Sequence, residues 1–408
     1  MRGNTKTKQH VILRELPLQS GSNLNSVDFD TARKRLENLG YFQGVGVSQV
    51  NSNVPGYRDI NINVAEKQTG QVQFGVAFST IENLYLYGNV TQSNFDLGGL
   101  WGESFVGGGQ RLTLSAKLGT EYQSASLFLL EPWFLDTKLA LGNEAYYSSS
   151  QYISDYYEQV NYGYSISLRR ALSDTSSVAL KYRLERFDIK ADYDAPLYFI
   201  VNDGDFIRSN INLSYEYDTR DAMVTPRKGG NFEFGVNYSG PGSTVQTYGA
   251  NLAASYYRNS IWDSIFSVNV GMQTVDTVDS DEMVPIFERC FLGGQANLRG
   301  FRYHDVGMMG SEQYSGDETT GGNSSFYAQF EVSIPIVQSV RFATFIDVGF
   351  VHEESMDFTP DELAADFGFG VRMDVGMGPM AIDFAFPIQS DNAIDDGMQV
   401  QFYIDYKY

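Results

Sequence analysis

From Gln71 onward the sequence alternates between apolar and polar residues with a period of two. The clearest runs are residues 71–78, 111–118, 178–185 and 211–218. One side of each run is apolar and aromatic and the other is polar, as expected for a β-strand whose two faces meet different surroundings. A soluble sandwich would turn the apolar side inward, whereas a membrane barrel would turn it outward to lipid. Both folds predict the same alternation, so alternation alone leaves them open.

The number of segments favours the barrel. The roughly 340 residues after position 68 divide into about 16 segments, too many for one sandwich and suited to one closed barrel. Closure is required in lipid because an open sheet edge would leave backbone groups unpaired. The 27 Tyr and 28 Phe suit the aromatic belts of such barrels. We therefore predict a mainly β fold: a 16-stranded antiparallel transmembrane β-barrel that follows one small α/β domain.

The charge is unevenly distributed along the chain. Residues 1–68 carry a net charge of +3 and the remainder carries −24, which indicates two domains, 1–68 and 69–408. A total of −21 argues against nucleic acid as a partner, because few cations remain to neutralise phosphates. Cys290 is the only cysteine, so an internal disulfide and a multi-cysteine metal site are excluded. We expect no metal and no cofactor.

Residues 1–68 have the pattern of an α/β unit. We predict a short helix over Val11–Leu16 and a second one from Asp28 to Leu39, with Asp28 as its cap. Two strands are predicted at Val45–Val50 and Tyr57–Val64. A further first strand is expected before Met1, and no signal peptide opens the sequence, so we expect a fragment.

A glycine-rich stretch interrupts the alternation at residues 287–307. Gly293 and Gly294 allow sharp turns, and Gly300 lets Arg299 and Phe301 point in different directions. Such a long loop with a definite shape is often functional. The alternative is a surface arginine in a flexible loop, and these residues alone do not separate the two.

Several motifs resemble one family. Residues 1–68 resemble a POTRA domain, the one next to the barrel in BamA-like outer-membrane assembly factors. The barrel region is similar to the same family at Glu131–Phe134, Asp218–Asp221 with Pro226 and Gly229, Gly321–Asn323, Phe345–Gly349, Gly378–Met380 and Asp383–Pro387. With Leu298, Arg299, Gly300 and Phe301, these motifs span nearly the whole chain in the family's order.

The resemblance implies roles for the central loop. A loop at about 276–322 would fold into the barrel lumen, where Arg299 would contact Glu331 and Asp347 on the inner wall. A guanidinium suits this task because it bonds carboxylates bidentately and stays charged. These three residues would act as a structural anchor or take part in handling substrate. The turn with Asp218, Arg220, Asp221, Pro226 and Gly229 would be structural, and we expect no enzyme because no nucleophile or histidine adjoins it.

The resemblance also implies a seam between the first and last barrel strands. Its residues would be Val72, Phe74 and Val76 on the first strand and Phe402, Ile404, Asp405 and Tyr408 on the last. The family commonly has a glycine where Asp405 stands, which leaves open how readily this seam separates. The aromatic Tyr408 looks like the signal by which such barrels are recognised for assembly.

The function implied is that of the central barrel subunit of the machinery that folds and inserts outer-membrane proteins. Its partners would be unfolded outer-membrane clients, accessory lipoproteins, periplasmic chaperones and outer-membrane lipid, with the POTRA domain in the periplasm. POTRA edges would bind extended segments through their backbones. Three alternatives stay open: a TamA-like or two-partner secretion pore, a passive porin-type channel, and an outer-membrane enzyme.

Overall fold

The computed structural model describes residues 1–17, 21, 25–102, 104–375, 378–394 and 397–404. The chain is divided into two compact units. One comprises Met1–Phe74, Gly88–Ala116 and Ser126–Glu144; the other comprises Gly75–Tyr87, Lys117–Ala125 and Ala145–Tyr408. The first unit therefore joins the N-terminal domain to parts of five neighbouring strands, and the second holds most of the sheet.

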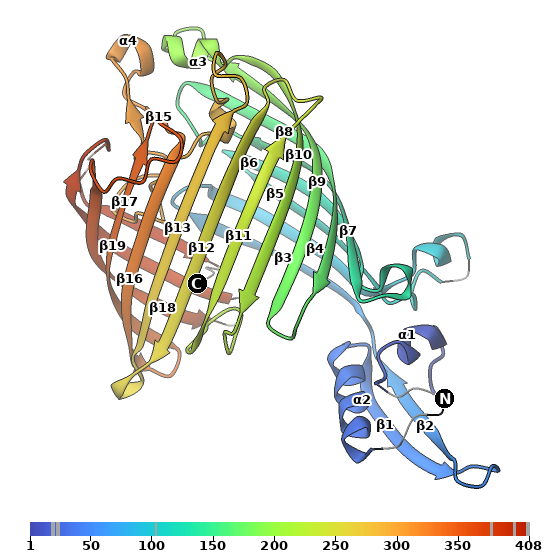
Figure 1. Cartoon of the computed structure of the whole chain (residues 1–408). Coiled ribbons are helices and arrows are strands. Elements are labelled where there is room, and N and C mark those ends of the chain that lie inside the picture. Colours follow the sequence, from blue (N-terminus) through green and yellow to red (C-terminus); the bar gives the residue numbers. More distant parts are fainter. Residues whose placement is uncertain (18–20, 22–24, 103, 376–377, 395–396, 405–408) are drawn as a thin grey trace. The chain divides into compact units, whose positions relative to one another are not determined.

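The N-terminal domain consists of helices α1 (Gln9–Leu13) and α2 (Ser26–Asn38) and the antiparallel strands β1 (Phe42–Asn51) and β2 (Arg58–Glu66), blue in Figure 1. Its core is made of Val11, Ile12, Leu36, Tyr41, Phe42, Ile62 and Val64. Arg2 forms a parallel bridge with Asn63, so β2 is paired on both sides at this point.

The cap of α2 differs from the sequence prediction. Asn25, and not Asp28, caps the helix, because the Asn25 side chain accepts a hydrogen bond from the Val27 backbone N–H at 3.1 Å. Asp28 instead lies in the first turn, where a negative charge is favourable next to the unpaired N–H groups of the helix. Helix α1 also begins and ends earlier than predicted.

Sixteen antiparallel strands form the sheet of the barrel, as predicted. Their order in the sheet follows the sequence from β3 to β13 and then from β16 to β20. They are β3 (Gly70–Ser79), β4 (Asn83–Phe95), β5 (Gln110–Gly119), β6 (Tyr122–Glu131), β7 (Leu139–Ser150), β8 (Tyr157–Ala171), β9 (Ser176–Ala191), β10 (Gly204–Asp218), β11 (Gly229–Ser239), β12 (Thr247–Asn259), β13 (Ile265–Thr277), β16 (Ser324–Val337), β17 (Val340–His352), β18 (Ala364–Val375), β19 (Gly378–Ser390) and β20 (Gln399–Ile404).

The exposure of the two faces decides between sandwich and barrel. The apolar side chains of the alternating strands are the exposed ones, as at Phe74 (84%), Leu180 (46%) and Leu213 (48%). Acidic side chains on the other face are buried, including Glu185 and Asp347. A surface this apolar suits lipid and not water. Among the described residues, no helix is long and apolar enough to cross a membrane.

The longest connection runs from residue 278 to residue 323, between β13 and β16, and we call it the central loop. It contains the 3-10 turn η4 (Ile286–Glu288), the short strands β14 (Met308–Met309) and β15 (Thr319–Gly321), and helix α4 (Glu312–Ser315). Helix α3 (Leu197–Val201) lies between β9 and β10. Leu292, Leu298, Phe301 and Val306 of the loop pack against Val351 of β17 and Ala364 of β18, on the face opposite the exposed apolar one.

The central loop and the strand seam

Arg299 lies at the centre of a buried ionic network. Its Nε and Nη2 donate to the two carboxylate oxygens of Asp347 at 2.7 Å each, and its Nη1 donates to Glu331 at 2.7 Å. The Arg299 backbone N–H also reaches Asp347, at 3.2 Å. The guanidinium carbon lies 3.5 Å from the centre of the Phe345 ring. This bidentate pairing with Asp347 fixes the orientation of the guanidinium as well as its position.

The sequence of the loop explains how Arg299 reaches the wall. Gly293 (φ 111°) and Gly294 (φ 92°) adopt left-handed conformations that favour glycine. The Asn297 side chain accepts hydrogen bonds from the backbone N–H groups of Gly293 and Leu298, at 2.7 and 2.8 Å, and closes the turn. Leu298 is completely buried, so the motif is held by packing as well as by charge.

Gly300 is required for a different reason than its freedom to turn. Its backbone N–H donates to Asp366 on β18 at 2.9 Å. An added Cβ would lie 2.4 Å from the Asp366 Cβ, closer than side-chain atoms approach. The glycine of the motif therefore permits close contact between the loop backbone and the wall.

The network extends beyond the three residues named from the sequence. Arg372 on β18 donates to Glu331 at 2.6 and 3.2 Å and to Asp383 on β19 at 2.5 Å. Asp383 in turn accepts from the Tyr403 hydroxyl on β20 at 2.9 Å. Sequence reasoning did not assign Asp366, Arg372, Asp383 or Tyr403 to this network, although Asp383 begins one of the family motifs. Their signal was a polar side chain at an inward position of an alternating strand.

The second compact unit contains both edges of the seam, Gly75–Thr80 on one side and Gln399–Ile404 on the other. A single backbone hydrogen bond joins these stretches, from Thr80 N–H to Phe402 O at 3.3 Å. The Thr80 hydroxyl donates to Gln401 Oε1 at 2.9 Å, and the Phe78 and Phe402 rings lie 5.9 Å apart. By contrast, β20 pairs with β19 over six residue pairs. The seam is the weakly bonded side of β20.

The predicted seam residues lie on these two strands. Val72, Phe74 and Val76 lie on β3 with exposed side chains, and Phe402 and Ile404 lie on β20, opposite Ile382 and Met380 of β19. Asp405 and Tyr408 lie outside the described residues. Phe78, Thr80 and Gln401, which make the contacts across the seam, were not predicted.

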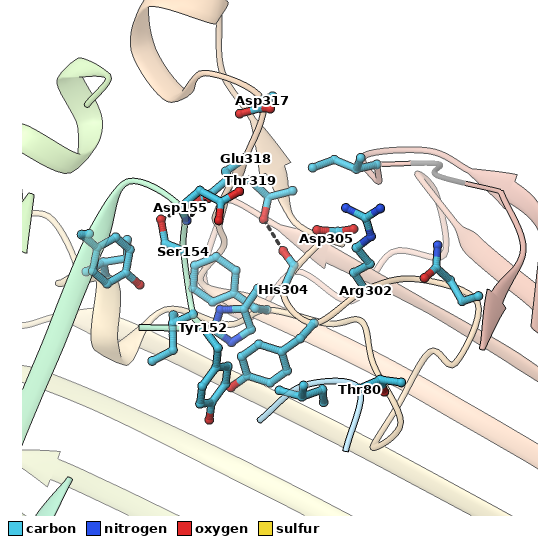
Figure 2. A pocket seen from close by; sticks show the side chains of 18 of the residues that line it. Thr80, Tyr152, Ser154, Asp155, Arg302, His304, Asp305, Asp317, Glu318 and Thr319 are labelled. Carbon is cyan, nitrogen blue, oxygen red and sulfur yellow. Dashed lines mark hydrogen bonds between the residues drawn. The ribbon is translucent and has the colours of Figure 1, made fainter. Parts of the chain in front are cut away.

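A cavity of about 590 Å³ adjoins the seam (Figure 2). Thr80, Ile81 and Gln399–Gln401 line it from the two edges, and Arg302–Asp305 line it from the central loop. Glu318 accepts hydrogen bonds from the Ser154 hydroxyl and the Asp155 N–H, each 2.6 Å long, and Thr319 donates to the His304 carbonyl. The cavity thus lies between the seam, the segment of the central loop that follows Phe301, and the β7–β8 connection.

His304 is the titratable side chain of the central loop that stacks between aromatic rings beside this cavity. Its ring stacks on Phe291 and Tyr303, with centroids 4.2 and 4.0 Å apart. Burial lowers the pKa of His304 to about 3, so the ring is neutral at physiological pH. Among the described residues, no group of three or more His, Cys, Asp or Glu side chains is arranged to hold a metal ion.

Two family models match the chain. A model of the Omp85 superfamily domain matches residues 104–407, and a POTRA model, described as surface antigen variable number repeat, matches residues 1–67. The chain belongs to the Omp85 superfamily. It is a BamA-like member, with the mainly β fold and the POTRA domain predicted from the sequence.

Curated relatives of this Omp85 protein include two assembly factors. The outer membrane protein assembly factor BamA of Nitratidesulfovibrio vulgaris is 26% identical over 394 residues, which cover 95% of this chain and 48% of the relative. BamA of Neisseria meningitidis serogroup B is 22% identical, with coverages of 95% and 53%. The chain spans about half the length of these relatives.

Solved structures share the fold of this Omp85 protein. BamA from Haemophilus ducreyi lacking POTRA domains 1–3 has a TM-score of 0.81 at 21% identity, covering 98% of this chain and 82% of that one. CdiB from Escherichia coli has a TM-score of 0.65 at 14% identity, covering 96% and 73%.

The predicted turn motif follows β10 of the Omp85 barrel. Asp218 accepts hydrogen bonds from the backbone and guanidinium of Arg220, and Asp221 accepts from the N–H groups of Arg227 and Lys228 at 2.8 and 3.2 Å. Pro226 is buried, and Gly229 has a φ of 93° with no room for a Cβ beside the Thr219 carbonyl. Both carboxylates are engaged by their own turn.

The Glu131–Phe134 motif contacts the POTRA domain, within the first compact unit. The Trp133 indole donates to Glu15 at 2.7 Å. The Arg14 guanidinium lies 5.9 Å from the centre of the Trp133 ring and 3.5 Å from the Glu131 carboxylate. Arg14 also donates to the Gly109 carbonyl, in the β4–β5 connection, at 3.3 Å. Nearby, Lys8 pairs with Asp96 at 2.7 Å. This contact was not predicted.

Proposed function

We propose that this chain is the barrel region of a machine that folds outer-membrane β-barrel proteins and inserts them into the outer membrane. The observation that carries the proposal is the seam, where one backbone hydrogen bond joins the stretches Gly75–Thr80 and Gln399–Ile404. The family membership and the BamA relatives support it.

The seam would act through backbone pairing. A strand edge has a row of N–H and C=O groups that can bind any extended segment, whatever its sequence. If β3 and β20 separate, a client strand would pair with the freed edge and the next strands would follow it into lipid. This mechanism makes and breaks no covalent bond, so the chain would not act as an enzyme.

The partners follow from this mechanism. They would be unfolded outer-membrane proteins as clients, outer-membrane lipid around the exposed apolar face, and the accessory lipoproteins and periplasmic chaperones of the machinery. The POTRA domain would lie in the periplasm. Its strand β1 pairs with β2 along one edge and would bind extended client segments along the other.

The alternative with support is a secretion pore. CdiB structures share the fold, but with TM-scores of 0.65 and 0.59, below the 0.81 of the BamA structure. A TamA-like pore belongs to the same alternative. A passive porin-type channel fits less well, because the central loop is bonded to the inner face of the strands by Arg299 and packed there by Leu298.

The test is the folding rate of an unfolded outer-membrane barrel protein added to liposomes that contain the parent chain, the Arg299→Ala variant, or no protein. We expect faster folding with the parent and a clear loss with Arg299→Ala. The exposed Arg258 of β12 supplies a matched control, Arg258→Ala, which should fold clients as the parent does.

Two other outcomes separate the roles. Acceleration that is equal for parent and Arg299→Ala would keep the function and make Arg299 a dispensable anchor. No acceleration by any of the proteins would overturn the proposal and favour the secretion pore.

A further inference from the structure

Gln401 joins three segments that are far apart in the sequence. It lies on β20 with its side chain 3% exposed. Its Nε2 donates to the backbone carbonyls of Arg299 and Phe301, at 3.3 and 3.4 Å. Its Oε1 accepts from the hydroxyl of Thr80, the residue that follows β3, at 2.9 Å. One amide side chain therefore bonds the central loop on one side and the opposite edge of the seam on the other.

The chemistry of the amide makes these contacts interdependent. A glutamine has both a donor and an acceptor at its end, and here both are in use in a buried place. If Thr80 moves away, Gln401 Oε1 loses this partner. If the Arg299 motif leaves the wall, Nε2 loses its carbonyls. A buried polar atom without a partner is costly, so each contact favours the other.

A second link holds β20 to the same network. Tyr403 lies two residues further on the same face of β20 and donates to Asp383. Asp383 is bound by Arg372, and Arg372 shares Glu331 with Arg299. Consecutive inward residues of the last strand are thus bonded to the loop motif and its carboxylates.

We propose that Gln401 is a positioning residue that couples the anchoring of the central loop to the closure of the seam. With the Arg299 motif on the wall, Gln401 is held where it can accept from Thr80, and the seam stays closed at this point. Releasing the motif weakens this contact, and opening the seam weakens the hold on the motif, because a coupling between two sites is reciprocal. The importance of this coupling for clients rests on the proposed function; the coupling itself does not.

The test is the hydrogen exchange of the Thr80 amide, which donates the backbone bond across the seam. The folded chain is placed in lipid without any client, and the exchange rate reports the local opening equilibrium. The Gln401→Met variant keeps the shape of the side chain and removes its hydrogen bonds. We expect the Thr80 amide to exchange about 3- to 10-fold faster, as for the loss of one or two ordinary hydrogen bonds.

Gln399 supplies the matched control. It lies two residues earlier on β20 and has a half-buried side chain whose amide donates only to the nearby Gly397 carbonyl among the bonds described. Gln399→Met should leave the Thr80 exchange rate within about twofold of the parent, because this side chain makes no hydrogen bond to Thr80 or to the Arg299 motif among the bonds described. If Gln401→Met does not form a heat-modifiable barrel, Thr80→Val, at an exposed position, removes the same bond and carries the test.

The coupling is tested by adding Arg299→Lys. In the parent it should raise the Thr80 exchange rate, because lysine cannot form the two-pronged bond to Asp347. In the Gln401→Met background it should add little. An equal increase in both backgrounds, or no increase with Gln401→Met in a folded barrel, would overturn the proposal.

Client folding is measured separately in the same liposomes. If the two substitutions affect the Thr80 exchange rate non-additively but no protein accelerates client folding, the proposed function is overturned and the coupling stands. If client folding is accelerated but the two substitutions affect the Thr80 exchange rate independently, the coupling alone is overturned.

Discussion

At the scale of single residues, His304 is a group in the central loop that responds to pH. Its neutral ring lies between Phe291 and Tyr303, and a charge there would lose its hydration without gaining an anion in the stack. The pKa of His304 in the folded chain is about 3, below the ordinary value near 6.5. The unfolded loop therefore binds a proton more readily than the folded loop.

This difference sets the sign of a pH effect. Above about pH 6.5 both states are neutral and the stabilisation is complete, and it falls as the pH drops from there toward 3. We expect the local opening of residues 300–307 to become about tenfold more favourable for each pH unit below about 6.5. Hydrogen exchange at pH 7.5 and 5.0, corrected for its intrinsic pH dependence, measures this change.

His304→Asn is the control, because asparagine tolerates the φ of 68° at this position and does not titrate. Other acids line the same cavity, and burial raises the pKa of Glu318, so some pH dependence can persist in the variant. A pH response equal to that of the parent would assign the effect to those acids and not to His304.

At the scale of elements, the β6–β7 turn contacts the two residues that directly follow helix α1 of the POTRA domain. Trp133 donates to Glu15 and has Arg14 beside its ring, 5.9 Å from the centroid. Trp133→Phe keeps an aromatic ring and removes the donor, which should weaken this contact by about 1–2 kcal/mol. The readout is hydrogen exchange of the α1 amides, which should become faster.

Leu135 provides the control, since it lies in the same turn and its side chain is 77% exposed. Leu135→Ala should leave the α1 amides unchanged. If both variants speed exchange alike, the turn contributes through its backbone shape, and the indole bond to Glu15 has no separate effect.

Elements also show what the sequence could predict. The strands of the barrel were predictable because alternation is a local property that recurs in strand after strand. The exposure of apolar residues such as Phe74 then shows that the apolar face of the sheet points outward. The α2 cap was misplaced because Asn25 and Asp28 are both suitable cap residues, and only the backbone geometry shows which one accepts from Val27. Local patterns predict elements better than their ends.

The contacts of the seam could not be predicted for a related reason. Thr80 and Gln401 are 321 positions apart, and their hydrogen bond depends on the relative register of the first and last strands. No local pattern encodes that register. The pair of Arg299 and Asp347 was reached only through the family resemblance. Arg372 lay outside the family motifs, and Asp383 lay in the Asp383–Pro387 motif but had no partner assigned to it.

At the scale of the whole molecule, the central loop is anchored to two different parts of the wall. Besides the Arg299 network on β16 and β17, Glu288 of the loop accepts from Arg208 on β10 at 3.3 Å, from Ser239 on β11 at 3.1 Å and from Thr247 on β12. Arg299 is positively charged and Glu288 is negatively charged. Asp347 and Glu331, which bind Arg299, differ from the residues that bind Glu288. Release of the whole loop therefore requires both anchors to break.

This arrangement predicts how two substitutions combine. Glu288→Gln removes a charge but leaves Arg208 bonded to Glu185, so its effect should be about 1 kcal/mol. Arg299→Lys should have a larger effect, because buried carboxylates lose the two-pronged partner. For independent anchors the free energies of opening add. The increase in the rate at which an added protease cleaves the loop in the double variant, relative to the parent, should therefore equal the product of the increases in the two single variants.

Glu282→Gln, at an exposed position of the same loop, is the control and should be cleaved at the rate of the parent. A double variant no more sensitive than Arg299→Lys alone would mean that the Arg299 network holds the loop by itself, and that the Glu288 contacts only follow its position.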